Sequence, residues 1–220
     1  MSTYLEFEKP LEELKESLEA LKGYASDSNT DFSESLGLLS EKIHQAEEYF
    51  ISHLTPMEKV LMARHPQRPY PMDYVKRIFQ GFMEFHGDRR FADDEALFGG
   101  FAFLDDMPVM VIGTRKGRNI KDNLRCHFGS PYPEGYRKAL RLMRLAEKAH
   151  CPIITLVDTP GAFPGVAAEE RHIGEAIACN LEAMFDLSVP VVSVITGEGG
   201  SGGALALCVG NAVLILENAY

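Results

Sequence analysis

The first fifty residues carry hydrophobic side chains at helical spacing. Two sets of apolar residues recur at intervals of three and four: Leu11, Leu14, Leu18 and Leu21, then Leu36, Leu39, Ile43, Ala46 and Phe50. Each set forms one narrow apolar stripe along a helix. The turn-rich stretch GYASDSNTDFS separates them, and Ser33 or Ser35 is suited to cap the second helix. Residues 8–54 therefore predict a helical hairpin, and we treat residues 1–54 as a separate interface element.

Proline positions and a change of periodicity mark the next elements. Thr55-Pro56 is typical of a helix start, and the three prolines of RHPQRPYP interrupt the chain before a helix predicted for residues 72–85. ALFGGFAFL and PVMVIGT then flank Asp105-Asp106, and their apolar runs predict a β-hairpin.

The remainder of the chain alternates between helix and strand patterns. The expected elements are helix 134–149, strand 152–157, helix 169–187, strand 190–195, a short helix and a last strand, AVLIL. This alternation predicts that residues 55–220 form an α/β domain with a largely parallel sheet. The loops DTPGA and GEGGSGG follow two of its strands. Because ligands gather at the carboxyl ends of such strands, both loops should face one site.

The second glycine loop fits more than one known motif. Gly197, Gly199 and Gly202 match the dinucleotide pattern GxGxxG, and Glu217 lies at the spacing of a ribose ligand. That fold needs a helix long enough to cross the sheet, yet only residues 203–209 precede the next glycine. The pattern therefore disfavours dinucleotide binding.

A hydrolase and a phosphate loop are the next alternatives. Gly199, Ser201 and Gly203 spell GxSxG, but no histidine follows Ser201, so His172 from the preceding loop would have to serve as the base. A P-loop requires GK[ST], and residues 191–220 contain no lysine.

Backbone amide chemistry is the remaining interpretation of GGSGG. Glycines allow the backbone to approach a ligand closely, and N–H groups at a helix start carry partial positive charge. Donors of this kind stabilise oxyanions. Four glycines in five residues exceed what a tight turn requires.

Charge is unevenly distributed along the chain. The net charge is −10, yet residues 115–148 hold ten basic residues against three acidic ones. This stripe favours a small anion or an acidic partner, with a solvated helix face as the alternative and nucleic acid unfavoured.

Composition further limits the class of protein. The hydrophobic fraction is 45%, no run of about 18 apolar residues predicts a membrane span, and the N-terminus is too acidic for a secretory signal. Four scattered cysteines in apolar settings predict buried free thiols and no metal site: Cys126, Cys151, Cys179 and Cys208. We expect a cytoplasmic protein.

Several long segments resemble one enzyme family. The segments are HGDRRFADDEALFGGFA, KGRNIKDNLRCHFGSPYPEGYRKALRLMRLAEK, VDTPGAFPGVAAEERHIGEAIACNL and GEGGSGGALALCVGN. They closely resemble the alpha subunit of bacterial acetyl-CoA carboxylase carboxyltransferase, in the family's order and over nearly the whole chain. The resemblance implies a crotonase-type superhelix of ββα units. The family continues beyond residue 220, so we expect that a C-terminal part of the domain is missing.

The resemblance also implies a reaction and its partners. The carboxyl group of carboxybiotin, held on the biotin carboxyl carrier protein, passes to acetyl-CoA and forms malonyl-CoA, the first committed step of fatty acid biosynthesis. The family works as an α₂β₂ heterotetramer in which zinc lies on the beta subunit, while a separate biotin carboxylase uses ATP.

Site residues follow from the same resemblance. The backbone amides of Gly202 and Gly203 would form the oxyanion hole. The implied substrate-binding residues are Gly161, Ala162, Gly199, Gly200 and Ala204. The basic stripe adds Arg115, Lys116 and Arg118, whose charges would meet an anionic substrate or the carrier.

Two other classes of function remain open. A crotonase-like hydratase or isomerase would need a side-chain acid or base, for which Glu169 and Glu198 are the candidates. A non-enzymatic scaffold would bind the beta subunit or nucleic acid through residues 115–148.

Overall fold

The computed structural model describes residues 5–27 and 31–220. The chain divides into two compact units, one ending at Gln67 and the other running from Arg68 to Tyr220. Helix α3 therefore belongs to the first unit by its contacts. The functional boundary expected after residue 54 stays a prediction.

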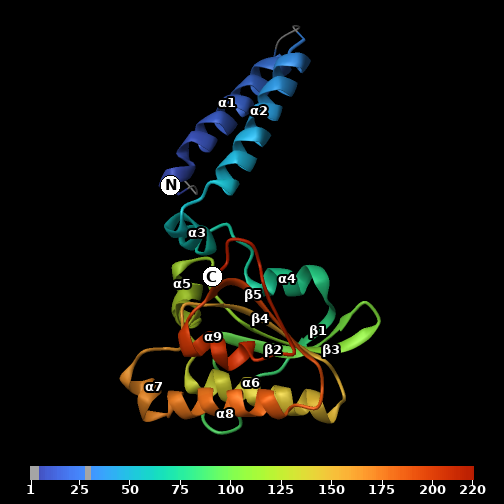
Figure 1. Cartoon of the computed structure of the whole chain (residues 1–220), viewed down its shortest axis with the longest axis vertical. Helices are drawn as coiled ribbons and strands as arrows, with labels where there is room; N and C mark the ends of the chain where they lie inside the picture. The colour runs from blue at the N-terminus through green and yellow to red at the C-terminus, as the bar shows by residue number, and fades with distance from the viewer. Residues whose placement is uncertain (1–4, 28–30) are drawn as a thin grey trace. The chain divides into compact units, whose positions relative to one another are not determined.

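Helices make up the first unit. They are a 3-10 turn at Glu6–Glu8, α1 (Lys9–Asp27), α2 (Ser33–Ser52) and α3 (Pro56–Ala63). Figure 1 shows α1 and α2 side by side, as the two apolar stripes predicted. Leu11 and Ile43 from these stripes are buried, and the rings of Phe7 and Phe50 stack with centroids 5.5 Å apart.

The helix ends differ in part from the prediction. The expected turn began at Gly23, but α1 continues to Asp27, and within this last turn Ser26 Oγ donates to the Lys22 carbonyl at 2.8 Å. The rest of the expected linker includes residues 28–30, which lie outside the described residues. Ser33 and Ser35 do not cap α2; the N-cap position is Phe32, and Asp31 accepts the Ser33 N–H at 2.9 Å.

One mixed sheet forms the second unit. Its strands are β1 (Gln80–Glu84), β2 (Leu97–Leu104), β3 (Met107–Thr114), β4 (Ile153–Thr159), β5 (Val191–Gly199) and β6 (Ala212–Ile215). They lie side by side in chain order. Strands β1, β2 and β3 pair antiparallel, and β3 also begins a parallel set that continues through β4, β5 and β6. The predicted β-hairpin and the largely parallel α/β domain are therefore both confirmed.

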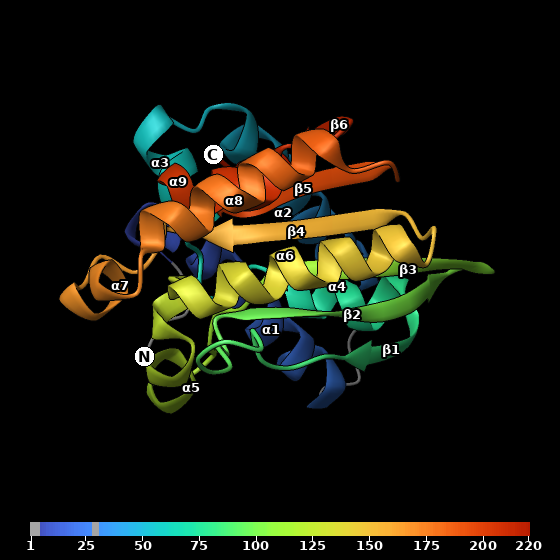
Figure 2. The same ribbon diagram turned by 90° about the horizontal axis from the view of Figure 1, so that it is seen from below.

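Helices cover both faces of this sheet. The covering helices are α4 (Pro71–Ile78), α6 (Pro133–Lys148), α8 (Ile173–Asp186) and α9 (Ser201–Cys208). Two shorter helices pack beside them: α5 (Ile120–Arg125) lies against a 3-10 turn at His127–Gly129, and α7 (Val166–Glu170) lies against α8. Figure 2 shows α6 and α8 running along one face, with α4 on the other.

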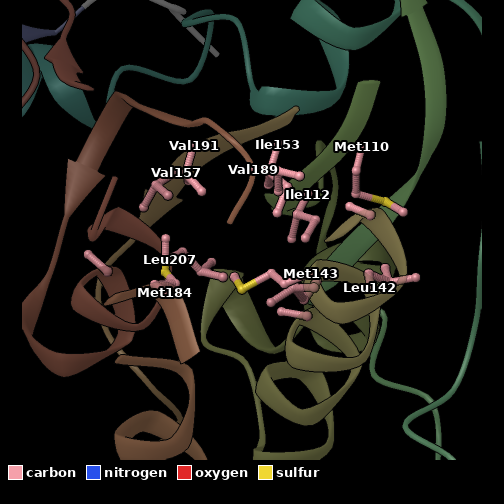
Figure 3. Packing of buried hydrophobic residues seen from close by; sticks show 14 residues of the cluster. Met110, Ile112, Leu142, Met143, Ile153, Val157, Met184, Val189, Val191 and Leu207 are labelled. Carbon is pink, nitrogen blue, oxygen red and sulfur yellow. The ribbon is translucent and has the colours of Figure 1, made fainter. Parts of the chain in front are cut away.

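Alternation along the strands explains why both faces are buried. Met110 and Ile112 of β3 join the core under α6 and α8, whereas Val109 and Val111 join the core under α4. In Figure 3, Leu142 and other α6 side chains lie opposite these strand residues. Each fully buried aliphatic side chain contributes about 1.5–3 kcal/mol. The carboxyl ends of β4 and β5 are thus held in a rigid frame.

Two predicted helices are interrupted. Residues 72–85 split into α4 and strand β1, because Phe79 adopts an extended backbone and the following residues pair with β2. Residues 169–187 split into α7 and α8 at His172, whose φ of 62° lies in the left-handed region and cannot continue a helix.

Candidate functional site

The two glycine loops meet at the carboxyl ends of β4 and β5, as their positions predicted. A cleft of about 510 Å³ lies between residues 160–164, the start of α8 and the first turn of α9. The approach is backbone to backbone, since a Cβ on Gly203 would lie 2.4 Å from the Ala162 nitrogen. A Cβ on Gly200 would lie 2.1 Å from the Pro160 carbonyl oxygen. Glycine at these two positions is therefore required by packing.

The amides around the cleft fall into two groups. Gly199 donates its N–H to the Tyr220 carbonyl at 2.5 Å, and Gly200 donates to the Thr159 carbonyl at 2.9 Å. By contrast, no carbonyl of the described residues accepts the N–H of Ala162, Gly202 or Gly203. These three amides are available to an anionic ligand.

Gly161 and Ala204, two further residues predicted to bind substrate, use their N–H groups in hydrogen bonds within the protein. Gly161 lines the cleft with a φ of 145°, and its N–H donates to Thr159 Oγ1 at 3.1 Å. Ala204 is buried and donates to the Gly200 carbonyl as part of the helix. The structure thus brings Gly161, Ala162, Gly202 and Gly203 to one cleft, while the oxyanion role of the last two stays a prediction.

Ser201 is the cleft residue with the most unusual backbone. Its φ of 52° is left-handed, and its exposed side chain lines the cleft. In the described residues, however, no histidine or carboxylate forms a hydrogen bond with its hydroxyl. His172, the base that a hydrolase would need, does not line this cleft. The geometry therefore lacks the activated nucleophile of a serine hydrolase.

The predicted dinucleotide motif does not have the required geometry. Gly197 and Gly199 are part of strand β5 itself, and α9 spans only eight residues. The Glu217 carbonyl accepts a hydrogen bond from Arg68 at 3.2 Å. A pyrophosphate would find no long helix behind this turn.

The first part of the basic stripe, residues 115–125, lies around a different cavity, of about 550 Å³. Arg115 and Arg118 line it, and each is already paired with an acidic residue. Arg115 donates to both oxygens of Glu84 at 2.9 Å, while Arg118 pairs with Asp73 and stacks 3.7 Å from the Tyr70 ring centroid. The structure does not bring these two arginines to the glycine cleft, and their role in substrate binding stays a prediction.

Lys116 connects the two regions. Its ammonium donates to Asp158 Oδ1 at 2.6 Å and to Glu198 Oε2 at 2.7 Å. Both carboxylates are almost fully buried. Burial alone would lower the pKa of Lys116, but the Asp158 and Glu198 carboxylates outweigh it and raise that pKa. Lys116 is therefore protonated and links the ends of β4 and β5 through two ion pairs.

Sequence reasoning missed this cluster, although its position offered a signal. Asp158 is the next-to-last residue of β4 and Glu198 is the next-to-last residue of β5, so each acid lies where its strand runs into a glycine loop. Tyr220 Oη also donates to Glu198 Oε1 at 2.5 Å, and the Glu198 N–H donates to Asp158 Oδ1 at 2.9 Å. Paired acids at adjacent strand ends predict a common cation, here Lys116.

The described ranges contain no group of three or more histidine, cysteine or acidic residues arranged to hold a metal ion. Over the same ranges, no helix combines the length and apolar character needed to cross a bilayer.

Curated relatives resemble almost the whole chain. The alpha subunit of acetyl-coenzyme A carboxylase carboxyl transferase from Bordetella pertussis is 54% identical over 218 residues, which covers 99% of this chain and 68% of that protein. The protein of the same name from Geobacillus kaustophilus is 53% identical over 218 residues, with 99% and 67% covered.

Solved structures support the fold. The transcarboxylase 12S core with hydrolysed methylmalonyl-coenzyme A aligns with a TM-score of 0.58 at 20% identity, over 77% of this chain and 30% of that one. The beta subunit of geranyl-CoA carboxylase from P. aeruginosa aligns with a TM-score of 0.56 at 21% identity, over 76% and 31%. The chain thus spans about a third of these solved chains, and the likeness confirms the predicted crotonase-type fold.

The match to a family model extends over residues 4–220, and the model is described as acetyl co-enzyme A carboxylase carboxyltransferase-like. Together with relatives that share about half of its residues, this match shows that the chain belongs to the family of acetyl-coenzyme A carboxylase carboxyltransferase alpha subunits, a family of transferases.

Proposed function

We propose that this chain supplies the half of a carboxyltransferase site that receives carboxybiotin. The observation that carries the proposal is that three amides around one cleft have no partner among the described residues, those of Ala162, Gly202 and Gly203. Carboxybiotin, delivered by the biotin carboxyl carrier protein, supplies the carboxyl group and develops negative charge on its ureido oxygen. Amides fixed by the glycine loops would stabilise that oxygen without reorganising during the reaction.

The same arrangement explains why no side-chain base stands out. The biotin anion can itself remove the α-proton of acetyl-CoA, and malonyl-CoA is the product. The protein then needs to orient the two substrates, hold the oxyanion and exclude water. Glu169 lines the cleft and Glu198 is held in the Lys116 cluster, so a hydratase would have Glu169 as its accessible acid.

The partners belong to the same proposal. We place acetyl-CoA and a zinc site on a beta subunit, in an α₂β₂ assembly, and ATP on a separate biotin carboxylase. The family name, which designates this chain an alpha subunit, supports a beta partner. The role in fatty acid biosynthesis and the cytoplasmic location rest on the family and remain part of the proposal.

We expect the chain to be inactive alone and active with a matching beta subunit, since the cleft offers amides without an acyl-CoA site. Malonyl-CoA formation from carboxybiotin would be measured with and without the partner, alongside sedimentation of both samples. Hydration of an enoyl-CoA is the control reaction. Full carboxyl transfer by the isolated chain at monomer mass would contradict the proposal, and hydration by that chain would favour the hydratase alternative.

Replacing Ser201 with alanine should leave most carboxyl transfer intact, within about threefold of the parent chain. The amides of Gly202 and Gly203 remain in place, and the hydroxyl is not activated by a base. The kcat of the assembled enzyme is the measurement. A decrease of about 10⁴-fold or more, as expected for a missing nucleophile, would instead revive the hydrolase interpretation.

A further inference from the structure

Tyr136 is a fully buried tyrosine whose hydroxyl has no hydrogen-bond partner among the described atoms. The side chain extends from α6 and is 0% exposed, and no described atom forms a hydrogen bond with its Oη. Burial, with a smaller contribution from the Asp94 carboxylate, raises the pKa of Tyr136, so the hydroxyl stays protonated. A buried hydroxyl without a partner is unfavourable for folding, and phenylalanine would fill nearly the same space.

This hydroxyl lies where the two glycine loops touch. A Cβ on Gly203 would be 2.7 Å from Tyr136 Oη and 2.4 Å from the Ala162 nitrogen. Tyr136 also packs in the cluster that contains Ile173, with Ala162 and Ile177 against it, and these three residues line the cleft. Oη therefore lies beside the contact between Gly203 and Ala162, on its buried side.

Helix α6 holds Tyr136 in place. The neighbouring Arg137 pairs with Asp88 at 3.0 Å, and Lys138 donates to Asp93 at 2.6 Å. Both ion pairs anchor the same helical turn to the segment before β2. These contacts fix the position of the Tyr136 hydroxyl relative to the two glycine loops.

We propose that Tyr136 is a positioning residue whose hydroxyl, from the buried side, sets the separation of the Ala162 and Gly203 backbones and so the placement of their amides. This inference rests on the proposed carboxyl transfer. Removing the oxygen atom leaves a gap at the point where the loop backbones meet. A small displacement of catalytic donors can cost about 10²-fold in rate.

Tyr136→Phe separates a positioning role from a structural one. A structural role predicts a lower Tm, whereas a positioning role predicts a lower kcat with an unchanged or higher Tm. We expect an unchanged or higher Tm, a kcat at least about tenfold lower and a KM within about threefold, measured with the assembled enzyme. The matched control is Tyr74→Phe on α4, a partly buried tyrosine in the core on the other sheet face. It should leave Tm and kcat nearly unchanged. A lower Tm for Tyr136→Phe, or an unchanged kcat, would overturn the proposal.

A second measurement does not depend on catalysis. In amide NMR spectra of the isolated full chain, Tyr136→Phe should shift the resonances of Ala162 and Gly203, while that of Ala102, in the other core, stays in place. The aromatic ring is retained, so such shifts report the hydroxyl. If the parent enzyme transfers no carboxyl group, the proposed function fails, and these shifts still decide the positioning role. Unshifted Ala162 and Gly203 resonances would refute it.

Discussion

Gly203→Val is expected to abolish carboxyl transfer and to lower the free energy of unfolding by about 3 kcal/mol, the upper part of the range for overpacking. The added Cβ would collide with the Ala162 nitrogen, the Gly161 carbonyl carbon and Tyr136 Oη, all within 2.7 Å. Two of these atoms belong to the backbone, so the loops themselves must separate. That separation displaces the amides that we assign to the oxyanion.

Gly202→Ala adds a Cβ at the neighbouring donor without the backbone collision, and so separates displacement of the loops from added bulk in the cleft. A Cβ there would meet Ile177 at 3.5 Å, an ordinary contact, so the loops need not move. Alanine also favours a helix by up to about 1 kcal/mol over glycine. Urea unfolding and malonyl-CoA formation would be measured for both variants. Near-normal turnover in Gly203→Val, with the fold intact, would eliminate the oxyanion assignment.

Lys116→Met should be the most destabilising single change in the site, by about 3–5 kcal/mol. It removes the cation from two buried carboxylates, Asp158 and Glu198, and leaves their charges close together. Among the described atoms, Asp158 Oδ2 already has no hydrogen-bond partner, so that carboxylate has little compensation left.

The pH dependence of this contribution has a definite sign. The folded-state pKa of Lys116 is raised, so its stabilisation is complete below about pH 10 and is lost only as the pH rises through the folded-state value. Lys116→Met should therefore lower stability throughout the neutral range.

Two controls make the Lys116 prediction specific. Lys121→Met makes the same substitution at an exposed position of α5 and should change stability by no more than about 0.5 kcal/mol. Adding Asp158→Asn to Lys116→Met should restore part of the loss, because one of the two charges disappears. Chemical denaturation of the three variants is the measurement. Equal stability of the Lys116→Met and Lys121→Met chains would show that the cluster is not a significant source of stability.

The fold could be predicted from the sequence where one local signal dominated. The apolar runs around Asp105-Asp106 gave the β-hairpin, and Thr55-Pro56 gave a capped helix in which Glu58 Oε2 accepts the Thr55 N–H at 2.7 Å. Residues 80–84 were misassigned to a helix because their strand depends on β2, a partner that local periodicity does not reveal.

The candidate site was predictable in its backbone but not in its side chains. Glycine spacing located the two facing loops, because glycine is the residue that allows two backbone segments to approach each other closely. The pairing of Lys116 with Glu198 joins residues 82 apart, and only the parallel register of the strands brings them together. Arg115 and Arg118 were grouped with the glycine loops by charge alone, and charge does not reveal the acids that already neutralise them.

The Lys116 cluster joins the ends of β3, β4 and β5, and this has a consequence for the order of folding. Lys116 and Asp158 are 42 residues apart, and Asp158 and Glu198 are 40 apart, with a crossover helix between each pair. Contacts of such long sequence separation form slowly, since the entropy of closing each loop must be overcome before the contact contributes. No local segment contains the cleft, so its amides reach their places only when both crossovers have docked. We therefore expect the frame of the cleft to form late in folding and to be lost together with the sheet that carries it.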